Sequence, residues 1–416
     1  MASGVDRRKV DGALSDIKVV DFGTVAVAPH HARYLADMGA IVVRVESHTR
    51  LETQRTAQPY KDGVPGISRS GLFPTSNSSK YGVTLDLAKP RGKEVALRLI
   101  KWADVVVEGF RPGVMERLGL DYESARRVKP DIIYLSSSQL GRGGPISSFG
   151  GFGFHSLALA GVYHLDGYPD REPAGLYGAY SDYVNPRISV AHIMAALDYR
   201  RRTGKGQYIE QAQLEGMLSF LAPVIMDYFV NNRIQGRQGN RVPQAAPHGS
   251  YPCRGDDGWV AIAVSSDEEW QALCRIVAEP WAKEARFATL LGRKQNEDAL
   301  DALLSEWTAR FPAEEVMNRL QAAGVPAGVV QRISQLFDDP QLKHRNHFRW
   351  LEDTGLGVHA YEALGFRLSH TPDSQFGAPA IGEHNEYVCK ELLGMSGEEI
   401  SQLLAEGVIT TDADMP

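Results

Sequence analysis

Residues 17–46, IKVVDFGTVAVAPHHARYLADMGAIVVRVE, decide the fold class of this chain. Residues 17–22 and 41–46 are short runs rich in Val and Ile, which is typical of strands buried on both faces. Between them, residues 32–39 predict a helix that a C-terminal glycine ends. A strand, a helix and a second strand with short connections form the βαβ unit of a parallel sheet.

The same alternation continues along the chain. Residues 81–86, 105–108 and 132–136 predict further strands, and residues 90–102 predict a helix with proline at its start. We therefore expect an α/β fold with a doubly wound parallel sheet. No G-x-G-x-x-G sequence follows the first strand, so the pattern does not indicate an ordinary dinucleotide site.

The chain changes character near residue 231. Before it, residues 186–202 and about 207–229 predict two long helices separated by a Thr-Gly-Lys-Gly turn. Residues 231–252 are rich in Gly, Asn, Gln, Arg and Pro, which indicates a linker. A smaller α+β domain is expected over residues 240–330. One strand and three amphipathic helices are predicted there, over residues 259–264, 268–277, 300–311 and 314–323.

Composition excludes several classes of function. The 416 residues include 45 Lys and Arg against 51 Asp and Glu, and this net charge of -6 argues against nucleic acid as a partner. No stretch has the apolar length of a membrane span, and residues 1–13 lack the apolar segment of a signal peptide. Cys253, Cys274 and Cys389 form no C-x-x-C pair or metal motif. We therefore expect a reducing, cytoplasmic location, without disulfides or a metal site.

Several segments, taken in order, resemble the class III CoA-transferases of the formyl-CoA transferase and carnitine CoA-transferase type. Residues 108–119, EGFRPGVMERLG, are similar to the family's E-N-F-R-P-G motif, with Gly109 in place of the asparagine. Residues 201–207, RRTGKGQ, match its R-x-R-T-G-x-G-Q turn. The other similar segments are 20–29, 35–46, 136–145, 323–328 and 339–341.

The resemblance implies a fold, a partner and an activity. In this family a Rossmann-like large domain is built from both chain ends, here residues 1–230 and 331–416, and the small domain at 240–330 is inserted. Two such chains interlock as a dimer, with a homodimer and a heterodimer of related chains both open. The reaction moves CoA from an acyl-CoA to a free carboxylic acid through an aspartyl-CoA thioester. This is covalent catalysis, and the family needs no tightly bound cofactor or metal for it.

Asp182 is the candidate nucleophile. It lies just before the predicted helix at 186–202, and its spacing from the turn at Thr203 matches the family's nucleophile position. On local chemistry alone, an aspartate at this place is more often a helix N-cap. The dipole of a helix start favours an ionised carboxylate, which a nucleophile requires.

The candidate binding residues rest partly on the resemblance and partly on charge. Val25, Ala26 and Arg117 correspond to family positions that bind CoA. Basic side chains nearby are candidates for the CoA phosphates, and a Gly-rich turn can present backbone N–H groups to an oxyanion. The candidates are Val25, Ala26, Lys80, Arg111, Arg117, Ser138 and Arg142 for CoA, and Gly141, Gly143, Phe152 and Tyr180 for the substrate.

Alternatives to a self-sufficient transferase stay open. A 2-methylacyl-CoA racemase shares this fold but needs a His and Asp pair, and Phe152 stands where the racemase histidine would be. The chain could also be a non-catalytic partner subunit of a heteromeric transferase, although the retained Asp182 favours the active chain. Residues 180–187, YSDYVNPR, also resemble the succinyl-CoA:benzylsuccinate CoA-transferases of anaerobic aromatic degradation. That subgroup implies succinyl-CoA as donor, an aryl-substituted succinate as acceptor, and an aromatic pocket formed by Phe149, Phe152, Phe154 and Tyr163.

Overall fold

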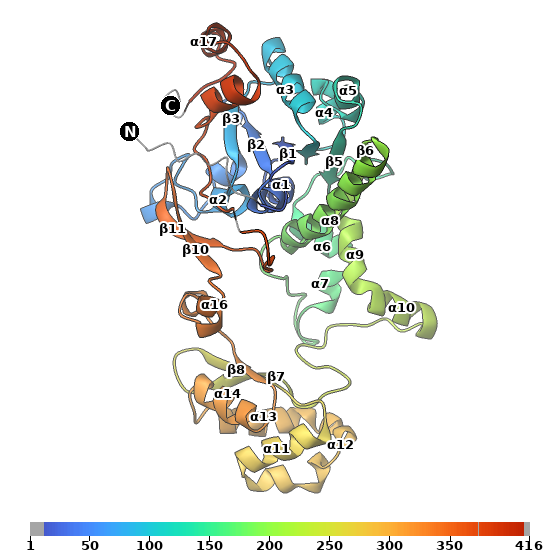
Figure 1. Ribbon diagram of the computed structural model, residues 1–416. Helices are drawn as coiled ribbons and strands as arrows, with labels where there is room; N and C mark the ends of the chain where they lie inside the picture. The colour runs from blue at the N-terminus through green and yellow to red at the C-terminus, as the bar shows by residue number, and fades with distance from the viewer. Residues whose placement is uncertain (1–11, 373, 412–416) are drawn as a thin grey trace. The chain divides into compact units, whose positions relative to one another are not determined.

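The computed structural model describes residues 12–372 and 374–411, which form two compact units (Figure 1). Unit 1 comprises the described residues up to Val162, residues Leu176–Arg233 and those from Arg345 onward, and unit 2 comprises the remainder. Residues 331–344, which we expected in the large domain, belong to unit 2. Arg332 attaches this segment there by an ion pair with Asp256 at 3.1 Å. The polar N-terminal residues 1–11 lie outside the described range.

A six-stranded parallel sheet forms the centre of unit 1 and confirms the predicted α/β class. Its order is β3-β2-β1-β4-β5-β6, which is the order of a doubly wound nucleotide-binding fold. The direction of winding therefore reverses between the neighbouring strands β1 and β4. The strands are β1 (Lys18–Asp21), β2 (Ile41–Glu46), β3 (Tyr81–Thr84), β4 (Val105–Glu108), β5 (Ile133–Ser138) and β6 (Gln207–Ala212).

Apolar layers cover both faces of this sheet. Val19 belongs to the layer that contains α1 and α8, and the next residue, Val20, belongs to the layer that contains α3, α5 and α17. Leu403 of α17 completes the second layer, so the C-terminal segment returns to unit 1. Burial on both faces explains the near-continuous apolar strands. The helices of unit 1 are α1 (Val27–Asp37), η1 (Thr53–Arg55), η2 (Lys61–Gly63), α2 (Leu72–Asn77), α3 (Pro90–Trp102), α4 (Val114–Leu118), α5 (Tyr122–Val128), α6 (Gly153–Leu159), α8 (Tyr180–Thr203), α9 (Gln213–Leu218), η3 (Ser219–Leu221), α10 (Ala222–Asn231), the π-helix η6 (Tyr387–Leu392) and α17 (Gly397–Ala405).

Strand β6 corrects the sequence interpretation of residues 207–212. We expected these residues to begin a helix, but they pair with β5 in parallel register, with Ile133 opposite Gln207. The helical spacing of apolar residues near Leu214 and Met217 belongs to α9, which begins directly after the strand. The partner strand that decided this conformation lies some seventy residues earlier in the chain, so local periodicity did not reveal it.

Helix α8 also differs from its prediction. It begins at Tyr180 rather than near Pro186, so Asp182 lies in its first turn and Pro186 lies inside the helix. Ser181 and Asn185 in this first part are fully buried and form hydrogen bonds with α6 and α9. These tertiary contacts hold residues 180–185 in helical conformation despite the proline.

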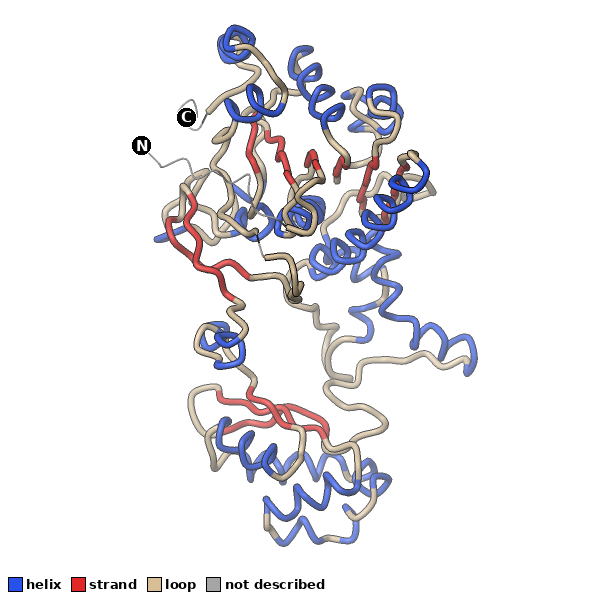
Figure 2. Tube along the Cα trace, viewed as in Figure 1, coloured by secondary structure: helices blue, strands red, loops and turns tan. Residues whose placement is uncertain are grey.

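Unit 2 has a three-stranded antiparallel sheet in the order β7-β8-β9, with α11 to α14 gathered on one side of it (Figure 2). Its own apolar core joins Val260 and Ile262 of β8 to Leu273, Leu300 and Leu304 of the helices. A separate hairpin of β10 (Phe348–Asp353) and β11 (Gly357–Glu362) belongs to unit 1. The elements of unit 2 are β7 (His248–Cys253), β8 (Gly258–Ala263), α11 (Asp267–Val277), η4 (Pro280–Lys283), η5 (Ala285–Phe287), α12 (Leu290–Gln295), α13 (Glu297–Thr308), α14 (Ala313–Ala322), β9 (Ala327–Val329), α15 (Ile333–Leu336) and α16 (Pro340–His344), and α7 (Val162–Leu165) spans the sequence boundary between the units.

The three cysteines are free thiols in apolar surroundings. Cys253 and Cys389 are buried and Cys274 is half-buried. Burial raises the pKa of all three, that of Cys389 to about 11, which makes them poor nucleophiles at neutral pH. Among the described residues, no helix combines the length and the apolar character needed to cross a bilayer.

Candidate active site

The carboxyl ends of β1, β4 and β5 enclose a pocket of about 120 Å³. β1 and β4 flank the point where the winding of the sheet reverses, and ligands of doubly wound folds bind at this point. The start of α6, Asp182 of α8 and Gln213 of α9 complete the lining. Of the residues predicted from sequence, the pocket brings together Val25, Ala26, Arg111, Ser138, Phe152 and Asp182.

Asp182 lies against the start of α6. Its side chain is 6% exposed. A Cβ atom added at Gly153 would lie 2.6 Å from Asp182 Oδ1 and 2.5 Å from Ser181 Oγ, so only glycine lets α6 approach the carboxylate this closely. The N-cap of α8 is Ala179, and no side chain caps its backbone. Asp182 is therefore not a helix cap.

Burial sets the acidity of Asp182. Burial disfavours the charged carboxylate and raises its pKa to about 7, and a hydrogen bond with Ser181 opposes this rise. The expectation that the helix dipole keeps the group fully ionised is therefore wrong, because desolvation outweighs it. Among the described residues, no cation contributes to this pKa. A carboxyl poised near neutral pH in a pocket is typical of a reactive group.

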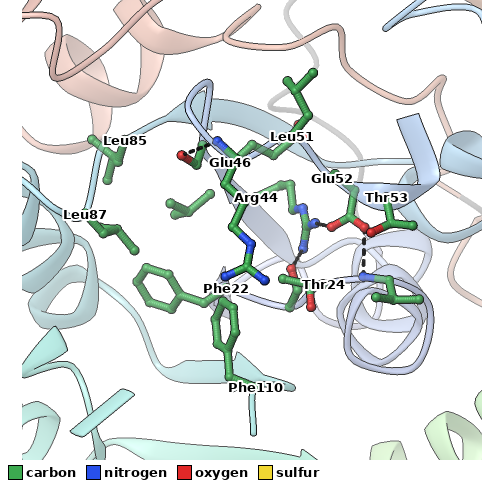
Figure 3. A pocket seen from close by; sticks show the side chains of 15 residues that line it. Phe22, Thr24, Arg44, Glu46, Leu51, Glu52, Thr53, Leu85, Leu87 and Phe110 are labelled. Atoms are coloured by element: carbon green, nitrogen blue, oxygen red, sulfur yellow. Dashed lines mark hydrogen bonds and ion pairs between the residues drawn. The ribbon is translucent and has the colours of Figure 1, made fainter. Parts of the chain in front are cut away.

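A second pocket, of about 190 Å³, lies beyond the carboxyl ends of β1, β2 and β3. Figure 3 shows part of its apolar lining, with the rings of Phe22 and Phe110 and the side chain of Leu85. The two pockets share Thr24, Val25 and Phe110. The two pockets therefore adjoin each other.

Val25, at the junction of the two pockets, has an unusual backbone. Its φ of 62° is rare for a β-branched residue. The Val25 N–H donates to Glu52 Oε1 at 2.8 Å, and Arg44 Nη2 binds Glu52 Oε2 at 2.7 Å, as Figure 3 shows. The charged pair thus holds Val25 and the following Ala26 in place at the pocket.

Lys80 is not a phosphate-binding residue. Its side chain is fully buried. Its ammonium group donates to Asp21 Oδ2 at 2.8 Å, Pro29 O at 2.8 Å and Asn77 Oδ1 at 3.0 Å. These bonds use all three hydrogens of the group. The prediction that Lys80 binds CoA is wrong, because the ammonium group neutralises the buried Asp21 at the carboxyl end of β1.

Arg142 is likewise committed to carboxylates. Its guanidinium pairs with Glu108 and, at 3.1 Å, with Glu116. Gly141 and Gly143, the predicted oxyanion residues beside it, line neither pocket. Acidic side chains thus hold Arg142 away from a CoA phosphate, while the roles predicted for Gly141 and Gly143 stay predictions.

The remaining predicted residues differ in their distance from the pocket. Ser138 is buried in its lining, and its hydroxyl has no hydrogen-bond partner among the described residues. Phe152, 53% exposed, and the exposed Arg111 also line it. Arg117 is exposed on α4, and Tyr180 is half-exposed at the start of α8, both outside the lining.

Sequence reasoning missed Gln139, Gly153 and Gln213, which all line the Asp182 pocket. Gln139 directly follows Ser138 at the end of β5, so the predicted end of this strand could have indicated it as a pocket residue. Gln213 follows the last residue of β6, but residues 207–212 were interpreted as helix. Recognition of this strand would have placed Gln213 at the same sheet edge, because the carboxyl ends of parallel strands meet there.

Known proteins resemble this chain over nearly its whole length. The sequence matches CoA-transferase family III over residues 14–385. Succinyl-CoA–D-citramalate CoA-transferase of Chloroflexus aurantiacus is 30% identical over 400 residues, which cover 95% of this chain and 98% of that protein. Succinate–glutarate CoA-transferase of Agrobacterium fabrum is 31% identical, covering 91% of this chain and 95% of that protein. The alpha subunit of succinyl-CoA–L-malate CoA-transferase of Chloroflexus aurantiacus is 30% identical, covering 95% and 92%.

The fold agrees with these relatives. The crystal structure of a CaiB/BaiF family protein from Brucella suis superposes with a TM-score of 0.84 at 32% sequence identity, covering 92% of this chain and 99% of that one. The resemblance seen in the sequence motifs is thereby confirmed. The chain belongs to CoA-transferase family III, and it is a class III CoA-transferase.

Proposed function

We propose that this chain moves CoA from succinyl-CoA to a carboxylic acid through an aspartyl-CoA thioester on Asp182. The observation that supports this is a buried carboxylate, with a pKa near 7, in the pocket where the winding of the sheet reverses. The carboxylate attacks the thioester carbon and CoA thiolate leaves, which gives a mixed anhydride. The thiolate then attacks the Asp182 carbonyl, and the donor acid leaves. The acceptor carboxylate then attacks the aspartyl-CoA thioester and releases CoA thiolate, which gives a second mixed anhydride. The thiolate attacks the acceptor's carbonyl carbon in this anhydride, so that the acceptor leaves as its CoA thioester and the Asp182 carboxylate is restored.

The two connected pockets support the placement of CoA. Its adenine end fits the apolar pocket beside Phe22 and Phe110, and its thioester end then reaches Asp182 past Val25. Because Lys80 and Arg142 are paired internally, other cations must meet the phosphates. Arg50 and Arg111 are exposed and line the two pockets, which suits them to this role.

The acceptor acid is proposed to carry an apolar substituent, as an aryl-substituted succinate does. Phe149 and Phe152 line the Asp182 pocket with about half of their surface exposed. Such rings suit an aromatic group of the substrate. The values of kcat/KM for benzylsuccinate and for unsubstituted succinate analogues, measured in the wild type and in Phe149→Ala, test this. In the variant, kcat/KM should fall about tenfold for the aryl acid alone. An equal fall in kcat/KM for every acid would contradict the proposal.

Trapping the intermediate tests the nucleophile. After incubation with succinyl-CoA, mass spectrometry should find CoA on the peptide that carries Asp182. Asp182→Ala and Asp182→Asn should show no adduct, and transfer should fall by about 10⁴-fold or more. Asp198→Asn, an exposed position on the same helix, is the matched control and should retain transfer. Transfer that survives in both Asp182 variants would overturn the proposal.

A second copy of the chain is the proposed partner. Helix α10 contains no buried residue, and Met226, Phe229 and Val230 are 56%, 80% and 71% exposed. In Figure 1 this helix extends away from the rest of unit 1. Apolar surface of this kind is typical of a protein contact. Light scattering should give the mass of a homodimer with full turnover, and Phe229→Asp should shift it toward the monomer. A monomer that gains activity only from a different chain would favour the heteromeric alternative.

A further inference from the structure

Gln213 shares the pocket with Asp182 and is 7% exposed. Its Oε1 lies 3.2 Å from Ser181 Oγ, whose hydroxyl also lies 3.0 Å from Gly153 O and interacts with the Asp182 carboxyl. Because the oxygen of the carboxamide faces the hydroxyl, its NH₂ group faces away from Ser181. Among the described residues, none accepts a hydrogen bond from Gln213 Nε2. The group is a spare donor within the pocket.

Buried hydrogen bonds hold Gln213 in place. Asn185 Nδ2 donates to Ser181 O at 3.0 Å and to the backbone oxygen of Gln213 at 3.3 Å. Gln211 Nε2 donates to Asn185 Oδ1 at 3.1 Å, and Gln211 Oε1 lies 3.1 Å from His31 Nε2. These bonds join α1, α8 and β6 to the first residue of α9. A donor held this way needs no reorganisation during a reaction.

The spare donor lines the same pocket as the proposed reacting group. Ser181 Oγ, which contacts the Gln213 carboxamide, and Asp182 Oδ1 lie 2.5 Å and 2.6 Å from the position that a Cβ atom would take on Gly153. Among the described residues, no cation contributes to the electrostatics of the Asp182 carboxyl. Gln213 is a neutral donor in the lining of the pocket that could stabilise negative charge developing on the acyl oxygen of Asp182.

We infer that Gln213 Nε2 donates a hydrogen bond to the Asp182 acyl oxygen in the tetrahedral intermediates of CoA transfer. This inference rests on the proposed function, in which Asp182 is the nucleophile. When the acceptor carboxylate attacks aspartyl-CoA, a C–O bond forms and the C=O electron pair moves onto this oxygen. The pair returns as the C–S bond breaks and CoA leaves as the thiolate. No proton is transferred, and the N–H of Gln213 stabilises the oxyanion between the two events.

Two substitutions separate a donor from a structural residue. Gln213→Leu should lower kcat about 100-fold while the KM for succinyl-CoA changes by less than about threefold, as for other oxyanion donors. Gln213→Glu has the same shape and keeps an oxygen for the Ser181 hydroxyl, but it has no N–H and adds a negative charge. It should lose at least as much kcat as Gln213→Leu. Retained kcat in Gln213→Glu would overturn the inference, because only the Ser181 contact would then matter.

Gln54→Leu is the matched control, since Gln54 is a similarly buried glutamine whose Oε1 accepts a hydrogen bond from Ser76 Oγ, and it lines neither pocket. It should lower the thermal midpoint while kcat stays within about fivefold, and a fall equal to that of Gln213→Leu would overturn the inference. The CoA adduct on wild-type Asp182 is measured in parallel. Without the adduct, the nucleophile proposal and this inference both fall. With the adduct and unaffected Gln213 variants, only this inference falls.

Discussion

Asp21 and Asp182 are two buried carboxylates near the same edge of one sheet, and their surroundings differ. Asp21 is fully buried, with Lys80 Nζ at 2.8 Å, Arg44 Nη1 at 3.3 Å and the Gly23 N–H at 2.8 Å. Burial would raise its pKa, but the two cations and the hydrogen bonds outweigh burial and lower it. Both oxygens of the Asp21 carboxylate are bound by groups of the protein itself.

Asp182 is almost as buried but lacks a cation among the described residues, so burial raises its pKa to about 7. Its carboxylate faces a pocket instead of a lysine. The difference shows that burial alone does not decide what an aspartate does. A buried carboxylate that is paired with cations is costly to unpair and is committed to the fold, whereas an unpaired one reduces stability and stays available to react.

The largest effect is expected from breaking the buried ion pair of Lys80 and Asp21. Lys80→Met should lower the free energy of unfolding by about 3–5 kcal/mol, because it leaves Asp21 buried with one cation fewer. Urea unfolding measures this. Lys390→Met, which removes a surface ion pair of 3.9 Å, is the control and should cost less than about 1 kcal/mol. Equal losses in the two variants would show that burial adds nothing to the pair.

Removing the charge of Asp182 should raise the free energy of unfolding, whereas removing that of Lys80 lowers it. Its folded-state pKa of about 7 exceeds the ordinary value of 3.8, so the folded state binds more protons between these values and loses stability as pH rises through them. Asp182→Asn removes this loss. Its advantage in unfolding free energy should grow by about 2–3 kcal/mol between pH 5 and pH 8. A constant difference across this range would refute the unpaired state of the carboxylate.

The close approach of α6 to Asp182 gives the next prediction. Gly153→Ala places a methyl group 2.6 Å from the Asp182 carboxylate and should displace it, with kcat falling about 10–100-fold. Steady-state kinetics measures the effect. Gly397→Ala, where no atom lies within 4 Å of the added carbon, should leave kcat unchanged. Wild-type kcat in Gly153→Ala would show that the position of the carboxylate is not critical.

The pH profile of transfer gives the smallest effect. The nucleophile must be ionised, so kcat/KM should rise with pH and level off above about pH 7. At pH 6 it should be about tenfold below its plateau. The acceptor acid is chosen with a pKa well below this range, so that only the enzyme titrates. A plateau that begins near pH 4 would mean that Asp182 is stabilised as an ion, as Asp21 is.

Local sequence determined much of the fold. The runs around Val19, Val42 and Val105 predicted parallel strands because apolar runs of this length and composition are characteristic of buried strands. Helix α3 and strands β2 and β4 appear at the predicted bounds. The register from Asp182 to Thr203 also selected the nucleophile, because the similarity to a family preserves spacing along the chain.

Tertiary structure alone decided how the charged residues are used. In the sequence, Lys80 and Arg142 are simply cations near glycines, but in the fold Asp21 and Glu108 bind them. Residues 207–212 became a strand because β5 was there to pair with. Asp182 itself was visible from the sequence, but its raised pKa was not. Desolvation depends on what surrounds a group in space, and no local pattern along the chain records that.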